Sequence, residues 1–288
     1  MQQSPVLGVI GGSGLYEFKG LKNPNPVDIE TPFGKPSAPI MIGTIQDKPV
    51  AFLARHGIGH HLTPSEVNYR ANIYALKMLG IDKVISVSAC GSLRDDFVPG
   101  DIVVPDQIFD LTHKRSRSFF GDGLVCHISV AEPFCSSLSD LLLEALRLEN
   151  TTMHKGGAYI TIEGPRFSTK AESQTYRSWG MSIIGMTASP EVFLAKEAEM
   201  CYATMAHVTD YDVWHVSEKP VTVEMVVRTL HKNTELAQNA LFRLVEMLDD
   251  QAPCQCDSAL KDSLITNPAI IPENTRNKLD ILVRKYLD

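Results

Sequence analysis

The chain has 288 residues, of which 44% are hydrophobic and 21% charged, and its 27 Lys and Arg against 34 Asp and Glu give a formal net charge of −7. This length can bury a substantial core, while a mildly acidic chain argues against sequence-independent binding to nucleic acid or to anionic membranes. No apolar run approaches the roughly 20 residues that span a bilayer, and the N-terminus has no export-signal pattern, so we expect a cytoplasmic globular protein.

Strand-like and helix-like segments alternate along the chain, which favours an α/β fold. Several of the strand candidates are continuous Val, Ile and Ala runs, as expected for strands that are covered on both faces. The predicted strands are Pro5–Ile10, Pro39–Ile45, Pro49–Ala54, Lys83–Ser88, Asp101–Val104, Ala158–Ile162, Ser182–Met186 and Tyr202–Val208.

Capping patterns predict the helices between these strands. Thr63-Pro64-Ser65-Glu66 is a capping box with proline at the first helical position, and it predicts a helix that reaches Met78 before Gly80. The further helices are predicted to start at Thr169-x-x-Glu172, to run from Ser189-Pro190 to Glu199, and to run from Thr222 to about Leu248.

The composition and the hydrophobic pattern of the sequence change after Asp249. Residues 251–257 have the composition of a loop, and Asn274–Leu287 have the pattern of a final helix. We therefore predict a domain of residues 1–250. A C-terminal extension of residues 251–288 follows it, packed on the same domain or on a neighbouring subunit.

The six cysteines are too sparse for a disulfide-rich secreted domain. Cys90 and Cys201 lie in apolar, strand-like runs, where a free thiol usually behaves as a small hydrophobic side chain. Cys254-Gln255-Cys256 favours a reduced surface pair, with a redox-sensitive local bridge as the alternative.

A glycine-rich segment, Gly11-Gly12-Ser13-Gly14, follows the first predicted strand. Glycines at a strand end let backbone N–H groups approach an anion closely, and the Ser13 hydroxyl adds a donor. The spacing matches neither the dinucleotide-binding fingerprint nor the P-loop, which argues against a nucleotide-binding oxidoreductase. The segment is therefore either an anion site or a tight turn.

Arg55 and His56 directly follow the apolar strand that ends at Ala54. An arginine at that point needs a carboxylate or a bound anion, so it indicates either an internal salt bridge or an anion site. His56, His60 and His61 lie close in sequence, but the glycines around them predict a turn. Because no H-E-x-x-H motif or cysteine pair accompanies them, we expect no metal there.

Hydroxyl side chains end two more of the predicted strands, at Ser88 and at Thr187. Ligands of open α/β sheets bind at the carboxyl ends of the strands, so these hydroxyls should converge. Together with Ser13 and Arg55 they predict a cradle of the size of one phosphate.

Asp210 and Asp212 follow the last predicted strand. Two carboxylates at positions i and i+2 can face one pocket, where burial and mutual repulsion raise a pKa. A carboxyl group in that state suits an acid that hydrogen-bonds a leaving group. The alternative is a solvated loop with an Asx turn.

Taken in order, these and neighbouring segments resemble the motifs of the trimeric purine nucleoside phosphorylase family, most closely its 5′-methylthioadenosine phosphorylase branch. The resemblance covers residues 6–248 and implies a single α/β domain with a mixed, largely parallel central sheet flanked by helices. The segments are Gly11–Gly14, Leu53–Gly57, Ser88–Leu93, Thr161–Phe167, Met186-Thr187 with Pro190-Glu191, and Thr209–Asp212.

The resemblance implies a pentosyltransferase of purine and methionine salvage. It would convert 5′-methylthioadenosine and phosphate into adenine and 5-methylthioribose 1-phosphate, with phosphate as co-substrate and no metal or organic cofactor. It also implies a homotrimer with its sites at the subunit interfaces.

The resemblance also assigns site residues, motif by motif. The residues that match the phosphate site are Ser13, Arg55, His56, Ser88, Ala89 and Thr187. Those that match the nucleoside site are Phe167 on the purine, Met186 under the ribose, Asp210 and Asp212 at the purine N7 and 6-amino group, Val223, Val226 and Val227 at the 5′ group, and His127 lent by a neighbouring subunit.

The implied chemistry is physically coherent, because phosphate under C1′ would stabilise an oxocarbenium-like ribosyl cation and then capture it. Asp210 would give a hydrogen bond or a proton to N7 of the departing purine, and Asp212 would hold Asp210 or bias its proton. A non-catalytic binding module would leave this set of residues unexplained.

Specificity follows from the same residues. A carboxylate accepts from a 6-amino group and repels a 6-oxo group, so the aspartate pair favours adenine. The valines suit a methylthio group, although their spacing equally fits the buried face of a helix.

The alternative functions are a phosphorylase of 6-oxopurine nucleosides or of 5′-methylthioinosine, and a nucleoside hydrolase, which would not need Arg55. Gly185 stands where some family members carry asparagine, so one ribose-side hydrogen bond is either missing or made elsewhere.

Overall fold

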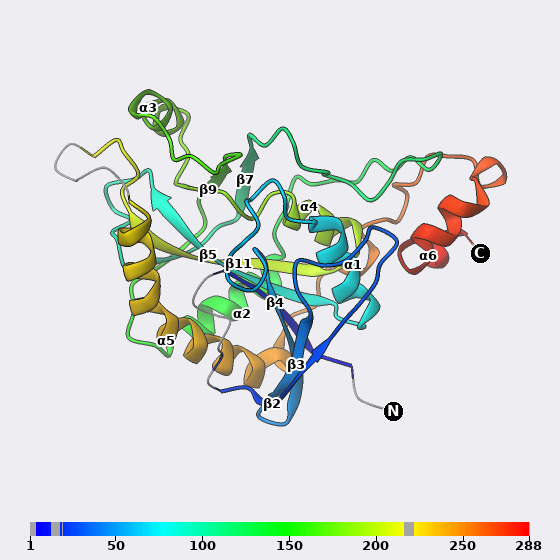
Figure 1. Cartoon of the computed structure of the whole chain (residues 1–288), viewed down its shortest axis with the longest axis horizontal. Coiled ribbons are helices and arrows are strands. Elements are labelled where there is room, and N and C mark those ends of the chain that lie inside the picture. Colours follow the sequence, from blue (N-terminus) through cyan, green and yellow to red (C-terminus); the bar gives the residue numbers. More distant parts are fainter. Residues whose placement is uncertain (1–3, 13–17, 19, 216–221, 288) are drawn as a thin grey trace.

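The computed structural model describes residues 4–12, 18, 20–215 and 222–287. At positions 223, 225–233 and 250 it describes the backbone but not the side chains. Its strands belong to one sheet (Figure 1). They are β1 (Leu7–Gly11), β2 (Lys22–Val27), β3 (Ile40–Ile45), β4 (Lys48–Ala54), β5 (Lys83–Ser92), β6 (Ile102–Val104), β7 (Gln107–Asp110), β8 (Met153–Lys155), β9 (Ala158–Thr161), β10 (Ile183–Gly185) and β11 (Cys201–Asp210). The helices are α1 (Tyr69–Met78), α2 (Ser136–Arg147), α3 (Lys170–Ser178), α4 (Glu191–Glu197), α5 (Val223–Met247) and α6 (Glu273–Leu287).

The sheet divides at β5, which has three neighbouring strands. The main path runs β2-β3-β4-β1-β5-β10-β9-β7, and β11 leaves it to pair with β5 and β6. β11 is parallel to β5 from Lys83 to Cys90, whereas β10 is antiparallel to β5 and pairs with Gly91 and Ser92. Because β1 and β4 are also parallel to β5 and to each other, several strands end at the same edge of the sheet. This mixed α/β architecture confirms the predicted fold class.

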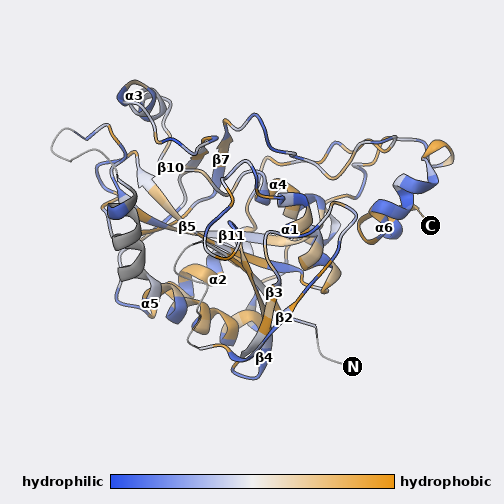
Figure 2. Cartoon of the chain, viewed as in Figure 1, coloured by the Kyte–Doolittle hydropathy of each residue, from blue (hydrophilic) through white to orange (hydrophobic). Residues whose placement is uncertain are grey.

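Helices cover both faces of the sheet. On one face α2 and α5 form a core with residues such as Ile85 and Val87 of β5, and on the other α1 and α4 form a core that includes Val84. Residues of α6 belong to this second core as well. Side chains of a strand alternate between faces, so neighbouring residues of β5 enter different cores. Figure 2 shows hydrophobic residues on β5, in the middle of the sheet. Each large apolar side chain buried there contributes roughly 1.5–3 kcal/mol.

All the predicted strands are found, but the sequence did not predict β2, β7, β8 or the helix α2. β2 has the sequence KNPNPV and is exposed; it lies at the sheet edge, where proline is tolerated. The capping box Thr169–Glu172 at α3 is confirmed.

The start predicted for the first helix is wrong, because α1 begins at Tyr69. The Glu66 carboxylate accepts hydrogen bonds from the backbone N–H and the hydroxyl of Thr63, and this closes a turn rather than a helix. The side chain of Asn68 caps α1 by accepting from the N–H of Ala71.

The C-terminal extension packs on the rest of its own chain. Leu279, Leu282 and Val283 of α6 are buried in the core that also contains α1 and α4. The Tyr74 hydroxyl of α1 donates to the carbonyl of Lys278 at 2.9 Å. Contacts of the extension with a neighbouring subunit stay a prediction. In the described part of the chain, no helix is long and apolar enough to cross a membrane.

Candidate active site

The candidate site lies where β5 divides. A register shift between Val208 and Asp210 places Asp210 opposite Gly91. A Cβ atom at position 91 would lie 3.0 Å from Oδ1 of Asp210 and 3.3 Å from Cβ of Asp212. Glycine at this position therefore gives both aspartates room at the strand end. Asp212 itself has a φ of 50°, a left-handed conformation that Asp tolerates better than most residues.

Asp210 and Asp212 are both buried, which excludes the solvated loop. Oδ2 of Asp210 accepts from the Thr209 hydroxyl at 2.7 Å, and Oδ1 accepts from the backbone N–H of Asp212 at 2.8 Å, in an Asx turn. Burial raises the pKa of Asp210 to about 6, despite these two hydrogen bonds. Burial also raises the pKa of Asp212, against the effect of the Ser173 and Ser168 hydroxyls. The pair therefore holds a carboxyl group that can be protonated near neutral pH.

The hydroxyl side chains predicted to converge do come together around a tyrosine. The Tyr159 hydroxyl lies 3.0 Å from Oγ1 of Thr187. Burial raises the pKa of Tyr159 to about 12, opposed by the nearby hydroxyls of Thr187 and Ser88. Oγ of Ser88 is buried and has no hydrogen-bond partner among the described residues. A buried hydroxyl without a partner costs free energy unless a ligand satisfies it. Ser88, beside Tyr159 and Thr187, lies where a bound anion can do so.

The sequence did not predict a role for Tyr159 in the site. The small residue Gly185 is the sequence feature that could have indicated it. A Cβ atom at position 185 would lie 2.1 Å from the Tyr159 hydroxyl oxygen. The phenol therefore occupies the space that a larger side chain at 185 would need. Its hydroxyl places a hydrogen-bonding group directly beside Gly185.

Arg55 makes the internal salt bridge that the sequence left open as one alternative. Its guanidinium is completely buried and holds the Glu191 carboxylate through Nε and through Nη2, the latter at 3.1 Å. Nη2 also donates to Oγ of Ser86 at 2.7 Å, and Nη1 donates to the carbonyl of Val87 at 3.2 Å. Glu191 in turn accepts from the Tyr202 hydroxyl at 2.8 Å. Contact between Arg55 and phosphate stays a prediction.

His56 is buried beside Arg55 and stacks on His60, with 4.4 Å between the ring centroids. Burial, helped by Arg55 and His60, lowers the pKa of His56 to about 3, so the ring is neutral at physiological pH. Its Nδ1 lies 3.1 Å from the carbonyl of Leu62. A neutral ring that donates from Nδ1 can only accept at Nε2.

Met186 and Phe167 differ in their surroundings. Met186 is half-buried over Gly164, where a Cβ atom would lie 2.6 Å from the methionine sulfur. Phe167 is 37% exposed. Ala89 is half-buried in β5, one residue after Ser88.

Two charged residues that the sequence did not single out support this region. Arg115 is buried and donates to the carbonyls of Ser189, at 2.6 Å, and Glu163, at 2.9 Å. The Glu163 carboxylate accepts from the backbone N–H of Lys114 at 3.0 Å. These contacts fix the loop after β10 that carries Thr187.

The structure does not test the remaining predicted site residues. Ser13 lies outside the described residues, as do the side chains of Val223, Val226 and Val227. His127 is exposed, and its backbone N–H donates to the carbonyl of Ser263 in the C-terminal extension at 2.9 Å. Its predicted role in a neighbouring subunit is not tested by a single chain.

Comparison with known proteins identifies the family. The sequence model of the phosphorylase superfamily matches residues 6–246. The chain belongs to the phosphorylase superfamily. This membership agrees with the resemblance found in the sequence motifs, and the matched residues include the strand ends of β1, β4, β5, β10 and β11.

The chain is similar to several proteins that are named methylthioadenosine phosphorylases. The chain is 52% identical to S-methyl-5′-thioadenosine phosphorylase of Gloeobacter violaceus over 97% of this chain and 95% of that protein. It is 51% identical to the Thermofilum pendens protein of the same name, over 90% and 98%. A methylthioadenosine phosphorylase from an antarctic soil metagenomic library has a TM-score of 0.93 at 44% identity, covering 98% and 100%. The Schistosoma mansoni methylthioadenosine phosphorylase in complex with adenine has a TM-score of 0.84 at 37% identity, covering 90% and 96%.

Proposed function

We propose that this chain is an S-methyl-5′-thioadenosine phosphorylase, which uses phosphate to release adenine and 5-methylthioribose 1-phosphate. The observation that carries the proposal is the buried pair of Asp210 and Asp212, in which burial raises the pKa of Asp210 to about 6. Relatives of about half identical sequence over nearly the whole chain bear this name.

The aspartate pair would act on the departing purine. Cleavage of the N-glycosidic bond leaves negative charge on the base, which a protonated Asp210 relieves by a hydrogen bond or a proton at N7. Asp212, whose backbone N–H already bonds Asp210, orients that carboxyl group. Ionised, the pair accepts from the 6-amino group of adenine and repels a 6-oxo group, so adenine is favoured over hypoxanthine.

Phosphate would bind at the hydroxyl side chains of Ser88 and Thr187. The Ser88 hydroxyl is buried without a partner among the described residues and can donate to an oxyanion. Ser13, Ala89 and His56 complete the site in this proposal, with the backbone N–H groups of Gly11–Gly14. The neutral ring of His56 would accept at Nε2 from the P–OH group of a phosphate that carries a proton. Arg55 would contact the phosphate as well, while its salt bridge with Glu191 holds the guanidinium at the strand ends. No metal or organic cofactor takes part in the reaction.

We further propose a cytoplasmic homotrimer in which His127 of a neighbouring subunit closes the nucleoside site. The position of His127 on a segment paired with the C-terminal extension, rather than beside Asp210, supports this arrangement. Light scattering tests it directly: a particle of three chain masses is expected, and a monomer would overturn the arrangement.

The function is tested by measuring adenine release from 5′-methylthioadenosine with and without phosphate, beside adenosine, inosine and 5′-methylthioinosine. Release is expected only with phosphate, and fastest from 5′-methylthioadenosine. Release at the same rate without phosphate would indicate a hydrolase. Faster cleavage of inosine or 5′-methylthioinosine would overturn the assignment of the aspartate pair.

A further inference from the structure

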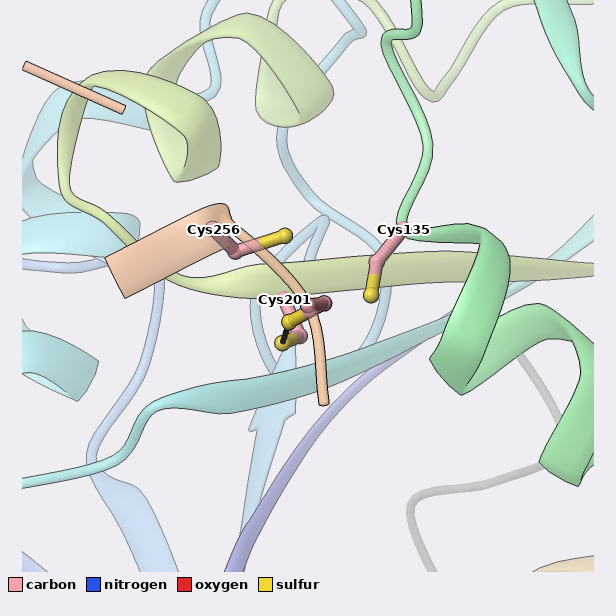
Figure 3. Close-up of side chains that lie close together, drawn as sticks. Cys135, Cys201 and Cys256 are labelled. Carbon is pink, nitrogen blue, oxygen red and sulfur yellow. Dashed lines mark hydrogen bonds between the residues drawn. The ribbon is translucent and has the colours of Figure 1, made fainter. Parts of the chain in front are cut away.

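Four cysteines gather at the end of β11 that is opposite the active site. We call them the cysteine cluster: Cys135, Cys201, Cys254 and Cys256. Their Sγ atoms all lie within 4.8 Å of one another, and all are free thiols. Figure 3 shows the sulfurs of Cys135, Cys201 and Cys256 directed into a common space. Cys201 begins β11 and Asp210 ends it, so the cluster lies about 30 Å along this strand from the aspartate pair.

The cysteine cluster corrects two expectations from the sequence. Cys254 and Cys256 are not a surface pair, because Cys256 is buried and Cys254 is half-buried. Cys201 is not an isolated hydrophobic side chain, because its sulfur lies 3.4 Å from that of Cys254. The short C-x-C segment that follows α5 thus meets cysteines from two distant parts of the fold. Cys135 is the N-cap residue of α2, and Cys201 is the first residue of β11.

The separations suit a tetrahedral metal site. A Zn–S distance of about 2.3 Å places the four sulfurs of a tetrathiolate about 3.8 Å apart. The separation of 3.4 Å between Cys201 and Cys254 lies below that value, and the limit of 4.8 Å for all pairs lies above it. Small side-chain rotations would therefore bring all four sulfurs onto one ion.

The surroundings supply N–H groups that favour thiolates. The backbone N–H of Leu138, in the first turn of α2, donates to Sγ of Cys135 at 3.4 Å. The side-chain amide of Gln251 lies 3.4 Å from Sγ of Cys201 and 4.0 Å from Sγ of Cys135. The N-terminal end of α2 adds a positive dipole at Cys135. Such outer contacts hold and stabilise metal-bound thiolates.

We propose that the cysteine cluster binds one Zn²⁺ as a structural tetrathiolate site. Binding forms four Zn–S bonds, breaks four S–H bonds and releases four protons to solvent, without transfer of electrons. Four soft thiolates in a closed tetrahedron favour zinc over Mg²⁺ or Ca²⁺ and leave no open position for catalysis. The ion ties the segment after α5 to α2 and β11, and so fastens the beginning of the C-terminal extension to the sheet.

The test uses the full-length protein, purified under reducing conditions without added metal. Its zinc and iron contents are measured by plasma mass spectrometry, together with its intact mass. Cys254→Ser removes one ligand from the cluster. Cys126→Ser is the matched control, because Cys126 is a half-buried free thiol outside the cluster. Exchange with Co²⁺ in the unmodified protein provides a second readout, since a tetrathiolate cobalt site has strong visible and near-ultraviolet bands.

About one zinc per chain is expected in the unmodified protein and in Cys126→Ser, with at least a tenfold lower content in Cys254→Ser. Chelation should lower the melting temperature of the unmodified protein and leave that of Cys254→Ser unchanged. Three results would overturn the proposal. The first is iron in place of zinc, and the second is a metal-free protein whose mass is lower by the hydrogens of one or two disulfides. The third is a protein with four free thiols that does not bind added Zn²⁺ or does not give the cobalt spectrum. The cobalt measurement decides the matter even if Cys254→Ser does not fold.

Discussion

Replacing Asp210 by asparagine should stabilise the protein at neutral pH while it removes activity. The pKa of Asp210 is raised from 3.8 to about 6 because its carboxyl group is buried. The ionised form therefore costs the folded state about 3 kcal/mol once the pH is well above 6. Asparagine has nearly the same shape and does not ionise. It can still accept from the backbone N–H of Asp212, so the folded state loses little by the change.

The sign and size of the pH dependence follow from the two pKa values. A folded-state pKa above the unfolded one gives a stabilising contribution that is fully present below pH 3.8 and is lost as the pH rises through about 6. Between pH 5 and pH 8 the unmodified protein should lose about 1.4 kcal/mol from this group. Asp210→Asn should not lose it, so its stability relative to the unmodified protein should grow by that amount over this range.

Urea unfolding at pH 5 and pH 8 measures this difference, and adenine release from 5′-methylthioadenosine measures the activity. Asp262→Asn is the control, because it makes the same chemical change at an exposed aspartate. We expect turnover of the Asp210 variant to fall by orders of magnitude, with oxopurine nucleosides less affected. An equal change in stability at both pH values would refute the reasoning on burial, and near-normal turnover would refute the acid role.

Three further changes test the support of the site. Glu191→Gln should lower the free energy of unfolding, measured by urea unfolding, by about 3–5 kcal/mol, because it leaves the buried Arg55 guanidinium without its carboxylate. A loss below about 1 kcal/mol would contradict that role. Gly185→Ala should cost roughly 1–3 kcal/mol through its clash with the Tyr159 hydroxyl. Gly12→Ala is the control and should cost little, because no atom of the described residues lies within 4 Å of the added Cβ; equal losses would argue against the clash. Tyr159→Phe should raise the KM for phosphate several-fold by releasing Thr187, as initial rates at varied phosphate will show, and an unchanged KM would separate Tyr159 from the phosphate site.

The sequence predicted the features that depend on local pattern. The apolar strands and the capping box at α3 were predicted correctly, because periodicity and caps act within a few residues. The start of α1 was missed because the Thr63 and Glu66 pattern fits a turn as well as a helix. β2 was missed because its prolines are tolerated only at an edge, and the sequence does not show which strand lies there.

The site was predicted in part for the same physical reason. Asp210 and Asp212 could be proposed from their spacing, but their burial depends on Gly91 of another strand. The Tyr159 contact with Thr187, and the choice of Glu191 over an anion as the partner of Arg55, join residues far apart in the chain. The cysteine cluster is the clearest example, since its members lie up to 121 residues apart and meet only through the fold.

The salt bridge between Arg55 and Glu191 should weaken the affinity of the site for the phosphorylated sugar product. At a distance of several ångströms the opposite charges of the two side chains largely cancel. In the proposed site, a phosphate at the strand ends would therefore face hydroxyl and amide dipoles more than a net positive charge. Binding of that kind is directional, short in range and only weakly screened by salt. A phosphorylated sugar formed there would dissociate readily, and the reaction could run in either direction according to the supply of base and phosphate.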